Sequence, residues 1–415
     1  MLRIAMLSYH TCPLATLGGK DTGGMNVYVR DLTRQLGRMG IHVDVFTRSQ
    51  DEHVPHVVHE LGYGNRVVHV PAGPETPLRK RAMVEFIPEF VEGVKRFASD
   101  KDIQYDLIHS HYWMSGLAAR ELNAAWSVPV IQMFHTLGLM KQRVARDERE
   151  REGEYRISGE REVLRLADRI VAATPAELAQ LQWLYQADIK KIVVIPPGVD
   201  TSHFYPIPVD EAKEFVGVPP CDHMLLFVGR IEPLKGIDIL LEALTIMHKT
   251  GIYVCLSVIG GNPGPDQDEI SAEMARLQSL REKYKLEDLV AFLGSRSQDS
   301  LPYYYSAADA VVVPSQYESF GLVALEAMAC GTPVVASQVG GLAFLIQDGV
   351  TGYTVPTDDP QALAERLALL ICNPELRQKM GENAARTARE YRWQRIAEKV
   401  LDLYNQVTGE PVLGD

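Results

Sequence analysis

The segment MLLFVGRIEPLKG, residues 224–236, consists of an apolar run followed by a loop that contains glycine, proline and two cations. A short apolar run that ends in such a loop is typical of a buried parallel strand. Similar runs recur along the chain, and longer amphipathic stretches separate most of them. This alternation predicts α/β architecture, with parallel sheets covered by helices on both faces. The predicted strands are Arg3–Leu7, His42–Phe46, Leu107–Ser110, Val128–Phe134, Ile170–Ala173, Lys191–Ile195, Met224–Val228, Val254–Gly260, Val290–Leu293, Ala310–Val313 and Val334–Ala336.

The strand pattern begins afresh with this segment, after a break that is rich in proline and glycine. The sequence PPG at 196–198 ends the first series of strands, and two more prolines follow at 206–208. A chain of 415 residues is also too long for one ordinary core. We therefore expect two Rossmann-like domains, residues 1–200 and 205–390, that face each other across a cleft. A C-terminal helix within 392–415 is expected to pack back on the first domain.

Composition is that of an ordinary globular protein, with 46% hydrophobic and 23% charged residues. The formal net charge of -12 repels a phosphate backbone, so nucleic acid is not an expected partner. No apolar run approaches the roughly 18 residues of a membrane span, and the apolar N-terminus lacks the flank of a signal peptide. The five cysteines include no CxxC pair. We therefore expect reduced thiols, with neither disulfides nor a zinc site, in a cytoplasmic protein.

A glycine-rich stretch, GGKDTGGMNVY at 18–28, follows the first predicted strand. Apolar residues then recur at helical spacing, which places Gly23 and Gly24 at the start of a helix. Glycine permits close backbone approach, and a helix N-terminus offers free N–H groups to an anion. These glycines are candidates to hold a phosphate or a sugar hydroxyl, and the alternative is a simple loop turn. The spacing is not GxGxxG, so the dinucleotide fingerprint does not apply.

Histidines gather where two predicted strands end. The sequences HSHYW at 109–113 and FHTLG at 134–138 both fall at carboxyl ends of strands, where α/β sheets bind ligands. We expect a functional role for His135, whereas His109 is equally consistent with a structural one. No carboxylate or cysteine completes a ligand set with His109 and His111, so no metal site is expected.

Three cations of the first domain, Lys80, Lys141 and Arg156, are candidates to bind an anion. Arginine and lysine hold phosphate through charge-assisted hydrogen bonds. For each of the three, taken alone, a solvated surface charge is a strong alternative. Residues 142–163 are densely charged, and most of these side chains are expected to face water.

Two cations and two glutamates follow strands of the second domain. Arg230 and Lys235 lie in the loop after its first strand, and two fixed cations suit a diphosphate that gains charge as it leaves. Glu318 and Glu326 are eight positions apart, and Gly321 between them is predicted to begin a helix. Glu326 within that helix can accept hydrogen bonds from a ribose, and the helix N-terminus can meet a phosphate. The alternatives are solvated loop cations and glutamates that only flank a helix start.

Together, the glycine-rich loop, His135, the Gly-Arg…Lys motif and the E-x7-E pair resemble the retaining GT-B glycosyltransferases of family 4 over nearly the whole chain. The sequences DTGGMNVY at 21–28 and HSHYW at 109–113 resemble the subgroup that adds N-acetylglucosamine to inositol phosphate. The DTGG sequence and HTLGLMK at 135–141 are also similar to sucrose-phosphate synthase. Met-Asn after the glycine pair, and the sequence RIEPLK, favour the inositol type.

The resemblance implies that a UDP-sugar, carrying glucose or N-acetylglucosamine, binds mainly to the second domain. Arg230 and Lys235 would neutralise the diphosphate, and Arg296 would lie near the uracil. Glu326 would hold the ribose, and Glu318 would contact the hydroxyls of the donor sugar. The implied donor-binding residues are Gly23, Gly24, Arg230, Lys235, Arg296, Glu318, Phe320, Gly321, Leu322 and Glu326. The implied catalytic residues are His135, Glu318, Arg230 and Lys235.

The resemblance also implies a small phosphorylated acceptor, an inositol phosphate or fructose 6-phosphate. Its hydroxyl would attack from the face that UDP leaves, without a protein nucleophile, a bound metal or a further cofactor. The implied acceptor-binding residues are Asn26, Lys80, Tyr112, Thr136, Lys141 and Arg156. Other classes stay open: a UDP-sugar epimerase or hydrolase of the same architecture, a regulator that binds the nucleotide sugar without chemistry, or a transferase for a glycan or lipid acceptor. A homo-oligomeric state is also left open.

Overall fold

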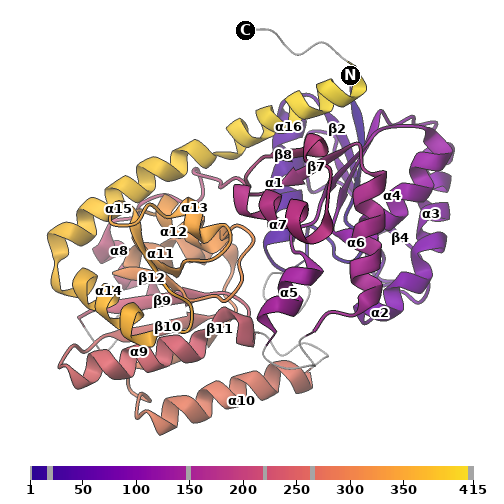
Figure 1. Cartoon of the computed structure of the whole chain (residues 1–415). Coiled ribbons are helices and arrows are strands. Elements are labelled where there is room, and N and C mark those ends of the chain that lie inside the picture. The colour runs from indigo at the N-terminus through magenta and orange to yellow at the C-terminus, as the bar shows by residue number, and fades with distance from the viewer. Residues whose placement is uncertain (1, 16–21, 146–150, 218–221, 262–266, 410–415) are drawn as a thin grey trace. The chain divides into compact units, whose positions relative to one another are not determined.

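The computed structural model describes residues 2–15, 22–145, 151–217, 222–261 and 267–409 (Figure 1). The chain forms two compact units. Unit 1 comprises Met1–Ala15, Gly24–Gly198 and Trp393–Asp415, and unit 2 comprises Thr16–Gly23 and Val199–Arg392. Residues 18–21 of the glycine-rich stretch lie outside the described residues.

Unit 1 is built on a sheet whose strand order, within the described residues, is β3-β4-β2-β1-β5-β6-β7-β8. The pairs are parallel except for the short β3, which runs antiparallel to β4. Strand β1 lies between β2 and β5, so the order reverses there, and such a reversal is where α/β sheets bind ligands. The strands are β1 (Arg3–Leu7), β2 (His42–Arg48), β3 (Val57–Val58), β4 (Arg66–Val70), β5 (Leu107–His111), β6 (Val130–Met133), β7 (Arg169–Ala172) and β8 (Ile192–Val194).

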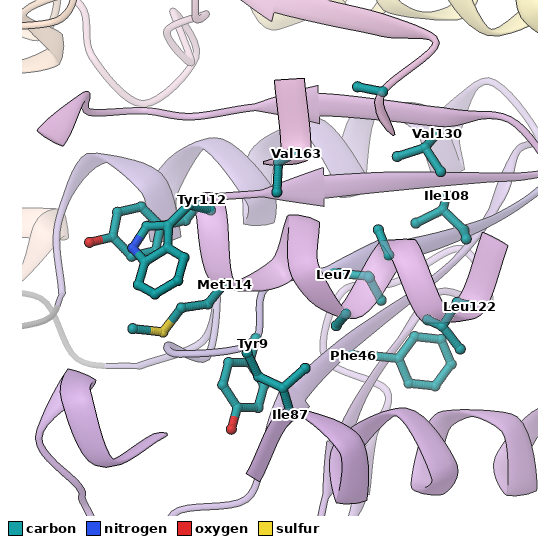
Figure 2. Close-up of a cluster of buried hydrophobic side chains, with 14 of the residues drawn as sticks. Leu7, Tyr9, Phe46, Ile87, Ile108, Tyr112, Met114, Leu122, Val130 and Val163 are labelled. Atoms are coloured by element: carbon teal, nitrogen blue, oxygen red, sulfur yellow. The ribbon is translucent and has the colours of Figure 1, made fainter. Parts of the chain in front are cut away.

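Helices on this sheet bury an apolar layer that Figure 2 shows in close-up. Leu7, Phe46 and Ile108 of three adjacent strands are fully buried in the same cluster as Met114 and Leu122 of α4. Burial of a side chain of this size contributes about 1.5–3 kcal/mol relative to exposure. The helices are α1 (Gly24–Arg38), α2 (Lys80–Met83), α3 (Ile87–Asp100), α4 (Trp113–Trp126), α5 (Gly138–Val144), α6 (Glu154–Leu166), α7 (Pro175–Tyr185) and α16 (Trp393–Thr408).

The last helix, α16, belongs to unit 1 although the segment Val199–Arg392 of unit 2 directly precedes it in the chain. Ile396, Val400 and Tyr404 recur every four residues and are fully buried, which gives α16 one continuous apolar face. This helix contacts α1, and the hydroxyl of Tyr404 reaches the ring of His109. The end of the chain therefore completes the core of unit 1.

Unit 2 contains a parallel sheet whose order, among the described residues, is β11-β10-β9-β12-β13-β14. The strands are β9 (Met224–Val228), β10 (Cys255–Ile259), β11 (Val290–Gly294), β12 (Ala310–Val313), β13 (Val334–Ser337) and β14 (Gly352–Val355). The helices are α8 (Val209–Val216), α9 (Ile237–Lys249), α10 (Gln267–Lys283), α11 (Leu301–Ala307), α12 (Leu322–Ala329), α13 (Leu342–Leu345), α14 (Pro360–Cys372) and α15 (Pro374–Ala388). Strand order reverses at β9, between β10 and β12.

Two strands that pair with predicted ones, β4 and β14, are absent from the sequence prediction. The β4 sequence RVVHV begins with a charge, which obscures its apolar character. In the structure, Arg66 forms two hydrogen bonds of 2.6 and 2.8 Å with Asp44 on the neighbouring β2. A cross-strand ion pair thus stabilises the polar start of the strand, and local sequence does not reveal such a partner.

The prediction of five reduced cysteines is wrong for Cys255, which is disulfide-bonded. Cys12, Cys330 and Cys372 are free. Disulfide formation requires Cα atoms about 4.4–6.8 Å apart, a distance that the fold decides and that sequence spacing does not give. The cytoplasmic location, which rested partly on reduced thiols, stays a prediction. Within the described part of the chain, no helix combines the length and apolarity that a membrane crossing requires.

Candidate active site

Two loops of unit 2 run side by side at the carboxyl edge of its sheet, one after β9 and one after β12. The backbone N–H of Gln316 donates to the carbonyl of Leu234 over 2.9 Å. Gly236 has a φ of +67°, and a Cβ there would collide with the carbonyl oxygen of Pro314. Only glycine therefore allows these loops to approach so closely. The contact lies at the reversal of strand order, the expected ligand position.

These loops bring together two of the predicted site residues, Lys235 and Glu318. The Nζ of Lys235 donates to Oε2 of Glu318 over 2.7 Å, and the side chains are 19% and 20% exposed. The carbonyl of Glu318 also accepts the N–H of Gly341 at 3.1 Å, which ties the loop to the segment after β13. The pair is thus held from three strand ends, so its position is set before a ligand binds.

The other charged residues of unit 2 that were predicted to bind the donor have resident partners as well. Arg230 forms an ion pair of 2.8 Å with Glu232. The Nε of Arg296 donates to the hydroxyl of Tyr304 over 3.1 Å. The next residue, Tyr305, donates its hydroxyl to Oε2 of the buried Glu326 over 2.7 Å. Helix α11 carries both tyrosines, so it links these two predicted nucleotide-binding side chains.

Helix α12 begins directly after the loop that carries Glu318. Phe320 and Gly321 are buried, and Gly321 has a φ of +102° at the position that caps the helix. The first N–H groups of a helix lack acceptors within it and form its positive end. The N-terminus of α12, from Leu322, therefore lies a few residues from Glu318 and offers donors to an anion.

In unit 1 the rings of the predicted histidines form a row in which His109 and His111 are buried and His135 is partly buried. Nδ1 of His109 shares a hydrogen bond of 2.7 Å with the Tyr404 hydroxyl, and Nδ1 of His111 shares one of 2.9 Å with Nε2 of His135. Burial lowers the pKa of His109 and of His135 to about 3, and that of His111 is also lowered, first by burial and then by its histidine neighbours. All three rings are therefore neutral at pH 7. Over the described residues, no group of three or more His, Cys, Asp or Glu that could hold a metal ion is present.

Tyr112 lies at the end of β5 with a φ of +73°, an unusual conformation for a bulky side chain. The Cζ of Arg156 lies 5.0 Å from its ring centroid, and the Nζ of Lys80 lies 5.6 Å away. Both distances are within the range of cation–π attraction. The ring therefore holds two of the predicted cations from different helices at one place.

Arg156 is 1% exposed and is the centre of a hydrogen-bond network. Its Nε donates to Glu160 over 2.8 Å, and its Nη2 donates to the carbonyl and hydroxyl oxygens of Thr136 over 2.9 and 3.0 Å. Its Nη1 donates to Oε1 of Glu152, and that oxygen also lies 3.3 Å from the Nζ of Lys141. We call the following set the Tyr112 cluster: Lys80, Tyr112, Thr136, Lys141, Glu152 and Arg156.

Most of the charged side chains of residues 142–163 were expected to face water, and two of them, Arg156 and Glu160, are exceptions. Arg156 is buried, and Glu160 is fully buried with its carboxylate accepting the N–H of Gly138 at 3.0 and 3.1 Å. The spacing of Arg156 and Glu160, four residues apart on α6, is a signal that could have found Glu160, because such residues share one helix face. Sequence reasoning selected only the arginine.

Asn26, Gly23 and Gly24, at or next to the start of α1, complete the predicted set. Asn26 is 1% exposed, and its Nδ2 donates to Thr11 Oγ1 and to the Cys12 carbonyl, both over 2.7 Å. It thus anchors the start of α1 to the loop after β1. Gly24 is the first residue of α1. A Cβ at Gly23 would have no atom within 4 Å, so packing within the described residues does not require glycine at this position.

Comparison with known proteins places this arrangement in a family. Residues 22–203 match the model of Glycosyltransferase Family 4, and residues 209–387 match that of Glycosyl transferases group 1. The chain is 40% identical to a D-inositol 3-phosphate glycosyltransferase of Actinosynnema mirum, over 98% of this chain and 97% of that protein. The chain belongs to glycosyltransferase family 4. A D-inositol 3-phosphate glycosyltransferase of Kineococcus radiotolerans is 41% identical over 97% of this glycosyltransferase and 95% of the relative.

Solved structures agree with the predicted GT-B fold of this glycosyltransferase. A sucrose-phosphate synthase from Thermosynechococcus elongatus superposes with a TM-score of 0.91 at 35% identity, over 99% of this chain and all of that one. Anabaena HepE, solved in complex with UDP and glucose, gives a TM-score of 0.75 at 19% identity over 98% of this chain and all of that one. The prediction of two α/β domains of GT-B type is confirmed.

The neutral histidine row gives the glycosyltransferase an acid-sensitive core. An unfolded histidine has a pKa of about 6.5, so below that pH the unfolded chain binds more protons than the native one. The contribution of these histidines to the free energy of unfolding is therefore fully present above pH 6.5 and is lost as the pH falls towards 3. We expect His109→Asn to reduce this slope by about 1.4 kcal/mol per pH unit between pH 6 and pH 4.

Urea titrations followed by tryptophan fluorescence measure this slope, because all four tryptophans lie in unit 1. His53→Asn is the matched control, since that side chain is 86% exposed. A pH slope in His109→Asn equal to that of the parent would show that the ring takes up protons in the native state.

Proposed function

We propose that this glycosyltransferase moves a hexosyl unit, glucose or N-acetylglucosamine, from a UDP-sugar to a hydroxyl of a small phosphorylated acceptor. Inositol phosphate and fructose 6-phosphate are the candidate acceptors. The Tyr112 cluster carries the proposal, since it gathers Lys80, Lys141 and Arg156, and such cations suit a phosphate monoester. The names of the relatives and of the T. elongatus enzyme support a phosphorylated acceptor. We assign acceptor binding to residues 1–200 and donor binding to residues 205–390.

The donor diphosphate would bind to the loop after β9. Arg230 and Lys235 supply two positive charges there, and the N-terminus of α12 adds N–H donors. Glu326, oriented by Tyr305, would accept hydrogen bonds from the ribose. Arg296 would lie near the uracil, and Glu318 would contact the donor sugar.

We further propose that transfer proceeds with retention and without a metal. The acceptor oxygen forms its bond to the anomeric carbon on the face from which UDP leaves, and the acceptor proton passes to the leaving phosphate. His135 is neutral and hydrogen-bonded to His111, which would orient it towards a hydroxyl of the donor sugar. Charge stabilisation by Arg230 and Lys235 would supply much of the acceleration. We expect turnover to be unchanged in EDTA. We also expect NMR of the product to show the same anomeric configuration, axial or equatorial, as that of the donor sugar.

A UDP-release assay across donors and acceptors tests the proposal. Each UDP-sugar is paired with fructose 6-phosphate, an inositol phosphate, or the unphosphorylated parent of each. We expect fast release only with a phosphorylated acceptor. Release at the same rate without an acceptor would favour the epimerase or hydrolase alternative, and equal rates with unphosphorylated acceptors would contradict the role of the Tyr112 cluster.

Lys80→Ala should weaken binding of the phosphorylated acceptor and not binding of the UDP-sugar. Lys80 is the first residue of α2, and its ammonium lies 5.6 Å from the ring centroid of Tyr112. Loss of one charge-assisted hydrogen bond to phosphate should raise the KM for the phosphorylated acceptor roughly ten- to hundredfold. The KM for the UDP-sugar should stay unchanged. Steady-state kinetics with each substrate varied in turn make this measurement, and an equal rise in both KM values would place Lys80 outside the acceptor site.

A further inference from the structure

Glu152 is the one member of the Tyr112 cluster that carries a negative charge, and it contacts the cations directly. Its Oε1 accepts a hydrogen bond of 2.5 Å from Nη1 of Arg156 and lies 3.3 Å from Nζ of Lys141. Burial would raise the pKa of Glu152, but Arg156 and Lys141 together hold that pKa below its usual value. The side chain is 21% exposed, so the charged carboxylate lies near the surface of the unit.

The second carboxylate that contacts Arg156, that of Glu160, differs from Glu152 in its burial and in the number of its hydrogen-bond donors. Glu160 is fully buried and is bound by Arg156, by the N–H of Gly138 and by the hydroxyl of Tyr185. It cannot leave without exposing several unsatisfied donors, which makes it a permanent support of the arginine. Glu152 differs from Glu160 in both respects. It lies before the first residue of α6, and its side chain is partly exposed to water.

The cations of this cluster can be occupied by the Glu152 carboxylate or by a ligand phosphate, and these two anions differ in charge. Lys80, Lys141 and Arg156 supply three positive charges to the cluster, and the permanent carboxylate of Glu160 contacts one of them, Arg156. A phosphate monoester carries about −1.5 to −2 charges at pH 7 and three acceptor oxygens. Glu152 supplies one charge and two oxygens. A phosphate group therefore matches the cations better than the resident carboxylate does.

We propose that Glu152 is a specificity-determining residue of the acceptor site, whose carboxylate occupies the phosphate-binding cations and is displaced by the phosphate of the acceptor. The inference rests on the proposed function, because it assigns the cluster to a phosphorylated acceptor. A neutral polyol or sugar lacks the charge to compete for Arg156 and Lys141. Glu152 thus excludes unphosphorylated acceptors at the expense of some affinity for phosphorylated ones.

Glu152→Gln tests this, since the amide retains an acceptor for Arg156 and removes the competing charge. Isothermal titration of the full chain with inorganic phosphate gives affinity independently of turnover. We expect Glu152→Gln to bind inorganic phosphate about tenfold more tightly than the parent, and to show a lower KM for fructose 6-phosphate or an inositol phosphate. It should also gain activity with the unphosphorylated acceptor. Glu152→Asp, which keeps the charge, should resemble the parent.

Glu154→Gln is the matched control, because Glu154 begins the same helix and its side chain is 73% exposed. It should leave phosphate affinity unchanged. Weaker or equal phosphate binding by Glu152→Gln would overturn the inference and make Glu152 a support of Arg156. Absence of turnover with every phosphorylated acceptor, in variants that bind phosphate more tightly, would reject the proposed function while upholding the role of Glu152 as a competing anion.

Discussion

Replacing Lys235 with alanine is expected to lower kcat for UDP-sugar turnover by about 10²–10³-fold. The ammonium lies in a loop held by the contact of Gly236 with Pro314, and it is mostly buried against Glu318. In the proposed mechanism it stabilises the charge of the departing diphosphate. Loss of one preorganised group that stabilises such charge costs this magnitude in other enzymes. UDP release under saturating donor and acceptor measures the effect.

Lys249→Ala provides the comparison, because Lys249 is an exposed cation at the end of α9 in the same unit. It should leave kcat unchanged. Thermal unfolding of both variants should separate loss of chemistry from loss of fold. A Lys235→Ala variant with parental kcat would remove the assignment of a diphosphate to this loop.

Replacing Arg156 with methionine is expected to lower the free energy of unfolding of unit 1 by about 3–5 kcal/mol. The guanidinium is the partner of the fully buried Glu160 and joins Thr136 to α6. Without it, a carboxylate would remain buried without its counter-charge, which is strongly destabilising. Urea unfolding followed by tryptophan fluorescence reports on this unit, where all four tryptophans lie.

Two further variants sharpen the measurement. Arg161→Met removes a half-exposed arginine of the same helix, and its effect should stay within about 0.5 kcal/mol. The double change Arg156→Met and Glu160→Met removes both buried charges and should recover part of the loss, although the N–H of Gly138 and the hydroxyl of Tyr185 lose their acceptor. A double variant no more stable than Arg156→Met would show that packing, and not the unpaired charge, causes the destabilisation.

Three candidate anion-binding cations, from both units, share one feature, which is a carboxylate partner. Arg230 is paired with Glu232, Lys235 with Glu318, and Arg156 with Glu152 and Glu160. A ligand phosphate must therefore exchange with a resident carboxylate wherever that carboxylate is free to move. Affinity then depends on the difference between two ion pairs, which makes these acidic partners as informative to mutate as the cations.

The linear sequence was sufficient for the α/β alternation and for most strands of both sheets. Central parallel strands such as β9 are buried on both faces, so they appear as uninterrupted apolar runs that local composition reveals. Spacing and residue type also singled out Arg156, Lys235 and Glu318. The strand β4 and the bonded state of Cys255 were missed, because each depends on a partner distant in sequence.

What only the folded chain established is which polar and charged groups meet. Lys235 and Glu318 are 83 positions apart, and His109 and Tyr404 are 295 apart, yet each pair is in hydrogen-bond contact. The roles of Glu152 and Glu160 likewise emerge only when the start of α6 is placed against Thr136 and Lys141. Propensity and periodicity are properties of neighbours along the chain, whereas an ion pair or a shifted pKa depends on distance and burial in space.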